Sequence, residues 1–197
     1  MADWRQRQKE ALRQEIYAAA LALFKEHGYD DTSVQQITAR VGVAKGTFFN
    51  HFPSKEHVLE QWYHGITFDS LEAARRRPWQ GAENVVIFLC ESMAAQAQVA
   101  PELLEAKARH GASPLLAQAE KVQDDEMDAF VLECCRRGQR DGELRPDLDL
   151  PFFVGAVGAM LTGTSREWSA SGRAFDFAAV IRERVRFLFL AARSVTP

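Results

Sequence analysis

Apolar residues recur three and four positions apart along almost the whole chain, which is the spacing of one face of an α-helix. The first such segment covers about 5–27, and Gly28 follows it as a residue type that commonly ends a helix. No run of alternating β-branched residues bounded by turn signals is long enough to indicate a sheet. The sequence therefore predicts an all-α fold of about nine helices.

Two short helices are expected next. Ser33 and Gln36 match the capping box that opens a helix, and Gly42 ends this helix after about two turns. Another short helix follows at about 45–51 and stops before Pro53, whose ring disfavours helical geometry at the preceding residue. Two short helices across a tight glycine turn form a helix-turn-helix.

Longer helices fill the rest of the chain, with proline or glycine near most of their ends. The predicted division is an N-terminal helix-turn-helix domain, 1–53, and a C-terminal domain, 54–197, which begins with the long connecting helix 54–77. The remaining helices are expected at about 83–99, 101–109, 114–140, 151–168 and 175–193.

Composition narrows the class of protein. The chain has 197 residues, a formal net charge of -3 and 47% hydrophobic residues, enough to bury a sizeable core. No apolar run approaches the ~20 residues needed to cross a bilayer, and the opening residues lack the apolar centre of a signal peptide, so we expect a cytoplasmic protein without a membrane partner. The three cysteines lack zinc-site spacing. We expect no metal, cofactor or catalytic residue.

The window 32–55 carries the most informative charge pattern. It holds Arg40, Lys45, His51 and Lys55 and no acidic residue, although the whole chain is net negative. A helix-turn-helix places its second helix in the major groove of DNA, while flanking donors hold phosphates. The window is therefore expected to present a positively charged face to duplex DNA.

The residue types at the start of the second short helix suit base and phosphate contact. Lys45 can donate to guanine O6 or N7 or to a phosphate, and Gly46 permits close approach of the DNA. Thr47 offers a hydroxyl for phosphate and a methyl group for thymine. These types together favour DNA binding.

Donors one turn further along extend the same surface. Asn50 and His51 point outward if Phe48 and Phe52 point into the small core, which we expect. Gln35, near the start of the preceding helix, is placed to reach a base.

The segment IYAAALALFKEHGYDDTSVQQITARVGVAKGTFFNHFPSKEHVL resembles the N-terminal domain of TetR-family transcriptional regulators, in a match that covers about 5–62. The resemblance implies an all-helical homodimer that binds a near-palindromic DNA operator and usually represses. It also implies a small-molecule effector that binds the C-terminal domain and releases the protein from DNA.

The resemblance extends to single positions. Phe49 stands where the family usually has a tyrosine, so the phosphate bond of that hydroxyl is missing, although the ring can still contact a thymine methyl. With both helix starts included, the expected DNA contacts are Ser33, Gln35, Ala44, Lys45, Gly46, Thr47, Phe49, Asn50, His51 and Lys55.

The last two helices predict self-association. Glycines crowd the helix at 151–168, each costing about 1 kcal/mol of helix propensity relative to alanine, which close packing against another helix would offset. The last helix has no polar face over 187–192, and an isologous interface would cover it. The resemblance implies a four-helix bundle from these helices of both chains. The expected seam is Gly155, Gly158, Ala159, Leu161, Val185, Leu188 and Ala192.

The effector site is expected among the helices of the C-terminal domain. No array of carboxylates or arginines indicates an acidic, sugar or metal ligand, so we expect an apolar or aromatic compound. Each candidate residue also suits a plain core. They are Trp62, Ile66, Phe88, Met93, Gln96, His110, Phe130, Cys134 and Phe153.

Two other functions stay open. The first alternative is a DNA-binding activator or a DNA-binding factor that is regulated by a partner protein. The second is a helical-bundle enzyme or ligand carrier, with Cys134 or His110 as nucleophile or base. The enzyme needs a histidine and a carboxylate oriented around a nucleophile, and the sequence has no local signature of that arrangement.

Overall fold

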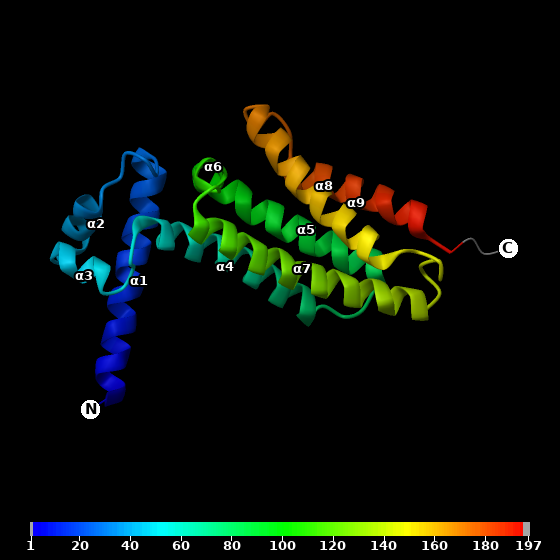
Figure 1. Ribbon diagram of the computed structural model, residues 1–197, viewed down its shortest axis with the longest axis horizontal. Coiled ribbons are helices and arrows are strands. Elements are labelled where there is room, and N and C mark those ends of the chain that lie inside the picture. The colour runs from blue at the N-terminus through cyan, green and yellow to red at the C-terminus, as the bar shows by residue number, and fades with distance from the viewer. Residues whose placement is uncertain (1, 195–197) are drawn as a thin grey trace. The chain divides into compact units, whose positions relative to one another are not determined.

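The computed structural model describes residues 2–194, and helices account for almost all of its regular structure (Figure 1). The prediction of an all-α fold is confirmed. No helix in this range is long and apolar enough to cross a membrane. The helices are α1 (Ala2–His27), α2 (Val34–Val41), α3 (Lys45–Phe49), α4 (Lys55–Arg76), α5 (Ala82–Val99), α6 (Pro101–His110), α7 (Pro114–Arg140), α8 (Leu150–Ala170) and α9 (Phe177–Ala192).

The chain forms two compact units. The first contains the residues up to Tyr63 together with Ala100–Ala119, and the second contains His64–Val99 and the residues from Glu120 onward. This division differs from the boundary expected at residue 53, because α6 and the start of α7 belong with the helix-turn-helix.

The first unit is held together by one apolar core. Phe24 on α1, Ile37 on α2 and Phe48 on α3 are completely buried in it. Leu103 and Ala106 on α6 belong to the same cluster and are equally buried. Since a fully buried leucine contributes roughly 1.5–3 kcal/mol, Leu103 of α6 helps to stabilise the same core in which Phe48 of α3 is packed.

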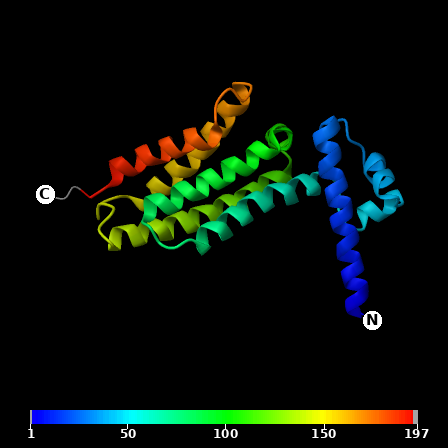
Figure 2. The ribbon, with the colours of Figure 1, turned by 180° about the vertical axis from the view of Figure 1, so that it is seen from behind.

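In the second unit, α9 packs most closely on α5 and next on α8, which runs antiparallel beside it (Figure 2). Aspartates cap both C-terminal helices: Asp149 Oδ1 accepts from the backbone N–H of Phe152, and Asp176 Oδ1 accepts from that of Ala179. The Asp176 cap explains why α9 begins at Phe177, two residues later than expected.

Candidate nucleic-acid interface

The turn of the helix-turn-helix is fixed by local hydrogen bonds. Ser33 Oγ accepts from the backbone N–H of Gln36 at 3.2 Å, and Gln36 Oε1 accepts from that of Ser33 at 2.7 Å, which confirms the predicted capping box. Gly42 ends α2 in the left-handed conformation with φ 78°, which glycine adopts without steric cost. Val43 then donates its backbone N–H to the Thr38 carbonyl at 3.0 Å. These bonds set the angle at which α3 leaves α2.

The three phenylalanines in and just after α3 lie where the sequence predicts, two in the core and one at the surface. Phe48 and Phe52 are completely buried, whereas the ring of Phe49 is 46% exposed. Lys45 and Asn50 are exposed beside Phe49. The burial of Phe48 therefore turns the opposite face of α3 toward solvent, as contact with a duplex requires.

All ten expected DNA contacts lie at the surface of the first unit. Thr47, His51 and Lys55 are half-buried. The exposed members are Ser33, Gln35, Ala44, Lys45, Gly46, Phe49 and Asn50. Their accessibility fits a DNA-binding surface, and their contact with DNA remains a prediction.

The charge on this surface is smaller than the sequence suggests. Arg40 forms a two-pronged ion pair with Glu26 of α1, with N–O distances of 2.9 and 2.7 Å, and this hydrogen bonding lowers the pKa of the Glu26 carboxyl. The face is therefore not free of acidic groups. Lys45, in contrast, has no hydrogen-bond or ion-pair partner among residues 2–194. It is the cation of this surface most available to DNA.

His51 is held at the edge of the surface by Arg13. The Arg13 guanidinium donates to the His51 carbonyl and to Gln61 Oε1, and it lies 4.2 Å from the centre of the Phe52 ring. Burial, together with the charges of Lys9 and Arg13, lowers the pKa of His51. Above that lowered pKa the imidazole is neutral, so at pH 7 it offers a hydrogen bond and not a charge.

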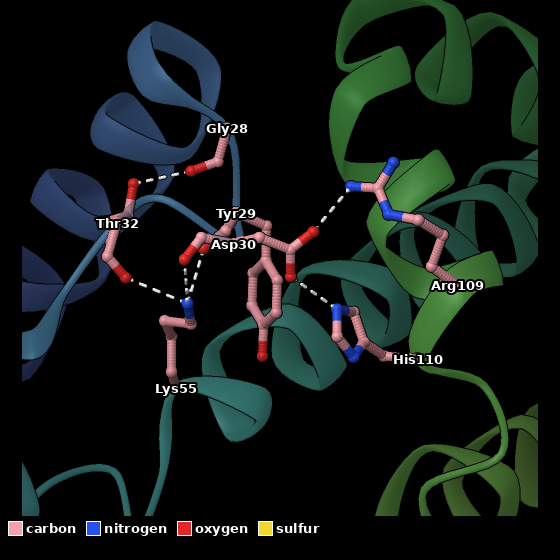
Figure 3. Close-up of polar contacts among 7 residues, drawn as sticks. All are labelled: Gly28, Tyr29, Asp30, Thr32, Lys55, Arg109 and His110. Atoms are coloured by element: carbon pink, nitrogen blue, oxygen red, sulfur yellow. Dashed lines mark hydrogen bonds and ion pairs between the residues drawn. The ribbon is translucent and has the colours of Figure 1, made fainter.

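Lys55 is engaged by the protein itself (Figure 3). Its Nζ donates to the carbonyl oxygens of Tyr29 at 2.5 Å, Thr32 at 2.9 Å and Asp30 at 3.5 Å, and it lies 4.2 Å from the centre of the Tyr29 ring. An ammonium has three N–H donors, and three carbonyls receive them here. Burial lowers the pKa of Lys55. A phosphate contact by Lys55 would have to compete with these bonds.

The same loop is tied to the end of α6 (Figure 3). Asp30 accepts from Arg109 at 3.1 Å and pairs with His110 Nε2 at 2.7 Å, while the His110 and Tyr29 rings lie 5.0 Å apart. The hydrogen bond with His110 is the main cause that lowers the pKa of Asp30. His110, expected in the effector site, is thus bound to the loop before α2, inside the first unit.

We expect Lys55→Met to destabilise the protein by about 1–3 kcal/mol, because three carbonyls lose a charged donor in a partly buried position. Lys45→Met is the matched control: it removes the same group from an exposed, unpaired position and should leave stability within ~0.5 kcal/mol. Urea denaturation of both variants measures the difference. Equal stability of the two would show that the carbonyl contacts of Lys55 contribute nothing.

The structure scatters the expected effector residues. Trp62 packs against the core of the first unit, and the Phe153 ring stands edge-on to Phe189 at 5.0 Å. Arginines cover two other rings, Arg77 over Phe88 at 4.1 Å and Arg75 over Phe130 at 5.8 Å. Two positions do meet: Gln96 Nε2 lies 3.4 Å from the carbonyl oxygen of Ile66. Met93 and Cys134 are buried.

A cavity of about 320 Å³ in the second unit is lined by none of these candidates. Glu83 and Glu143 lie at its wall beside Arg193, and Glu83 pairs with Arg193 at 2.8 Å. Glu143 Oε2 accepts the backbone N–H of Ala82 at the start of α5, so this carboxylate already caps a helix. The charged groups that line the cavity therefore stabilise the second unit by pairing with one another and by capping α5.

The cysteines are buried thiols. Burial raises the pKa of Cys134 to about 11 and that of Cys135 to about 12, so both are protonated at neutral pH. A protonated thiol is a poor nucleophile, which disfavours Cys134 as a catalytic residue. Within the described residues no group of three or more His, Cys, Asp or Glu side chains is placed to hold a metal ion.

The expected dimer seam needs a correction. Leu161, Val185 and Ala192 are buried in the protomer itself, at 9%, 0% and 1% exposure, because that side of α8 and α9 forms the core of the second unit. Gly158 and Leu188 are half-buried, and Gly155 and Ala159 are exposed. The large apolar side chains that do face solvent on α8 and α9 are Phe152, Phe187 and Leu190, at 78%, 70% and 53% exposure.

Two short helices around a fixed glycine turn, with an accessible lysine and asparagine on the outer face of the second, define a helix-turn-helix of the DNA-binding class. Comparison with known proteins agrees. A family model described as "Bacterial regulatory proteins, tetR family" matches residues 16–61. The chain belongs to the TetR family of transcriptional regulators, a class of DNA-binding proteins distinct from enzymes.

Relatives and solved structures support the family over most of the chain. The transcriptional repressor DhaR of Mycobacterium sp. (strain GP1) is 30% identical over 177 residues, which cover 79% of this chain and 85% of DhaR. A TetR family regulator from Shewanella sp. PV-4 is 27% identical with a TM-score of 0.61, covering 93% and 98% of the two chains. Thermus thermophilus FadR, solved with lauroyl-CoA, shares the fold with a TM-score of 0.74 at 24% identity, covering 94% and 96%.

Proposed function

We propose that the protein is a repressor that binds a palindromic operator as a homodimer and is released by a small molecule. The observation that carries the proposal is that the outer face of α3 at Lys45 and Gly46 does not help to stabilise the described part of the fold. Lys45 is unpaired, and a Cβ placed at Gly46 would meet nothing within 4 Å. The repressor DhaR is a relative that this chain matches over most of its length, and two FadR structures contain acyl-CoA ligands. These relatives support repression and an effector.

Dimerisation is proposed through the exposed apolar face of α8 and α9, defined by Phe152, Phe187 and Leu190. A shallow apolar groove beside Phe187 is lined by Met160 and Val180. Two such faces related by a two-fold axis would cover one another, which makes the interface isologous. Binding to a palindromic operator requires such a dimer to present two copies of α3 at half-site centres ~34–36 Å apart.

Release by a ligand requires that the DNA-binding unit respond to the second unit. The chain passes between the units within α4, before α6 and within α7, and α6 is bonded to the loop that precedes α2. A ligand that displaces any of these segments would change the position of α3. A ~100-fold loss of operator affinity needs about 2.7 kcal/mol of differential ligand binding between the two states.

Gly46→Ala separates DNA binding from folding. Glycine inside a helix costs about 1 kcal/mol relative to alanine and the added methyl group meets no protein atom, so the variant should be up to that much more stable. The same methyl group projects where a duplex would approach, so operator affinity should fall by at least about 10-fold, or 1.4 kcal/mol. Urea denaturation and fluorescence anisotropy with a labelled operator measure the two effects.

Gly65→Ala is the matched control, because Gly65 is also helical, a Cβ there also meets nothing within 4 Å, and it belongs to the second unit. It should gain stability in the same way and keep full operator affinity. If Gly46→Ala binds the operator as tightly as Gly65→Ala, the outer face of α3 does not contact DNA.

A further inference from the structure

Five uncharged polar side chains form two hydrogen-bonded groups in the second unit, one around Ser70 and one between Thr67 and Gln123, and the groups are neighbours because Thr67 and Ser70 are three residues apart on α4. Thr67 and Ser70 on α4 are 2% and 0% exposed, and Gln123 on α7 is 2% exposed. Gln96 Nε2 donates to Ser70 Oγ at 2.8 Å, and the hydroxyls of Ser70 and Ser92 lie 3.0 Å apart. Three helices thus contribute polar groups to one interior region, which we call the polar cluster.

The amide of Gln123 is the incomplete member of the polar cluster. Its Oε1 accepts from Thr67 Oγ1 at 3.2 Å, but its Nε2 is buried and has no hydrogen-bond partner. Turning the amide end for end would leave the oxygen without a donor instead, so one polar atom is unpaired in either orientation. Buried polar atoms are almost always paired, because an unpaired one loses its bond to water without replacement. The amide therefore lacks a partner that a ligand could supply.

The surroundings of the polar cluster suit a small apolar molecule. The buried apolar residues one to four positions from the cluster on the same three helices include Ile66, Leu71, Met93 and Met127. Methionine adapts its shape to different occupants more readily than branched residues do. Ligand sites commonly combine such apolar walls with a few polar groups that fix orientation.

We propose that the polar cluster is the polar end of the effector site and that Gln123 Nε2 donates a hydrogen bond to a carbonyl oxygen of a neutral, mostly apolar ligand, such as a medium-chain ketone or lactone. This proposal rests on the proposed ligand response. None of the five side chains carries a charge, and burying a carboxylate or phosphate without a cation would cost far more than burying a carbonyl. The oxygen of a ketone or lactone has lone pairs that can accept the hydrogen bond for which the Gln123 N–H has no acceptor in the protein.

Gln123→Met tests the proposal without any ligand. Removal of an unpaired buried amide should raise the melting temperature by about 2–4 °C. The Thr67 hydroxyl, which loses its acceptor, can turn to the carbonyl four residues back, as Thr38 and Thr164 do at 3.1 and 2.7 Å. Gln96→Met is the control, because that amide is bonded and its loss should lower the melting temperature. A lower melting temperature for Gln123→Met would overturn the proposal.

Ligand probes test the chemical class. Decan-2-one and γ-decalactone should each raise the melting temperature of the wild type, and Gln123→Met should weaken their binding at least about 10-fold, or 1.4 kcal/mol. Decanoate, which has the same chain length and a negative charge, should not bind. Failure of both neutral probes, equal binding to wild type and variant, or preference for decanoate would each overturn the proposal.

Operator binding by the ligand-free wild type is measured alongside. Its absence would defeat the proposed function while leaving the melting-temperature and probe results for Gln123 intact, so the two failures are distinguishable.

Discussion

Phe187→Glu should convert the proposed dimer to a monomer and weaken operator binding by at least about 100-fold, or 2.7 kcal/mol. Phe187 is 70% exposed on α9, and it lines the apolar groove with Met160 and Val180. Covering one such ring contributes roughly 1.5–3 kcal/mol, and two-fold symmetry doubles the loss. The interface would also take each glutamate away from water. Operator binding falls because a monomer engages only one half-site.

Phe68→Glu is the control for this substitution. Phe68 is 50% exposed on α4, away from α8 and α9 in the chain, so the same change of side chain should leave the protein dimeric. Sedimentation equilibrium gives the mass of each variant, and anisotropy titration gives operator affinity. A Phe187→Glu protein that remains a dimer would place the interface elsewhere.

Lys45→Ala combined with Asn50→Ala should remove most of the preference for the operator over random duplex. Both side chains are exposed on α3, and each well-formed contact to a base edge is worth about 1–3 kcal/mol of discrimination. In a dimer each loss occurs twice, so the expected reduction in specific affinity is at least about 100-fold, or 2.7 kcal/mol. Binding to random duplex should fall much less, because it depends on phosphate contacts and salt.

Arg40→Ala is the matched control on the same surface. Glu26 already holds the Arg40 guanidinium through two hydrogen bonds, so its removal should change operator affinity by less than about 3-fold, or 0.65 kcal/mol. Competition titrations with operator and random duplex separate the specific from the non-specific loss. If Arg40→Ala weakens operator binding as much as the double variant does, the Glu26 pair must open on DNA and the assignment of Lys45 as the main cation is incorrect.

The helix-turn-helix could be predicted from the sequence because its determinants are local. The capping box spans only Ser33 to Gln36, and the left-handed turn at Gly42 needs only a glycine at the end of an amphipathic helix. The burial of Phe48 and Phe52 follows from their spacing of four residues. Each of these features depends on neighbours within one or two turns of helix.

Pairings between distant residues could not be predicted in this way. Arg40 meets Glu26 fourteen positions earlier, and His110 meets Asp30 eighty positions earlier. Gln123 and Thr67 are fifty-six positions apart. The residues next to a polar side chain in an amphipathic helix do not indicate which residue of another helix it bonds. The polar cluster could therefore be found only after α4, α5 and α7 were placed together.

The dimer seam shows a different limit. The end of α9 is apolar all round, so its periodicity does not tell which side faces its own protomer. Val185 and Ala192 fill the core of the second unit, and the adjacent face with Phe187 and Leu190 remains exposed. The sequence therefore predicted an apolar surface on α8 and α9 but included Leu161, Val185 and Ala192, which the structure buries inside the protomer; the interface itself stays a prediction.

Selection of random duplexes by the purified full-length protein tests the central claim most directly. The account predicts enrichment of sequences with two inverted half-sites whose centres lie about one helical turn apart, ~34–36 Å, with affinity that falls as salt rises. It also predicts that the selected duplex is bound by two protein chains. Recovery of no preferred sequence, or of a single asymmetric half-site bound by one chain, would contradict it.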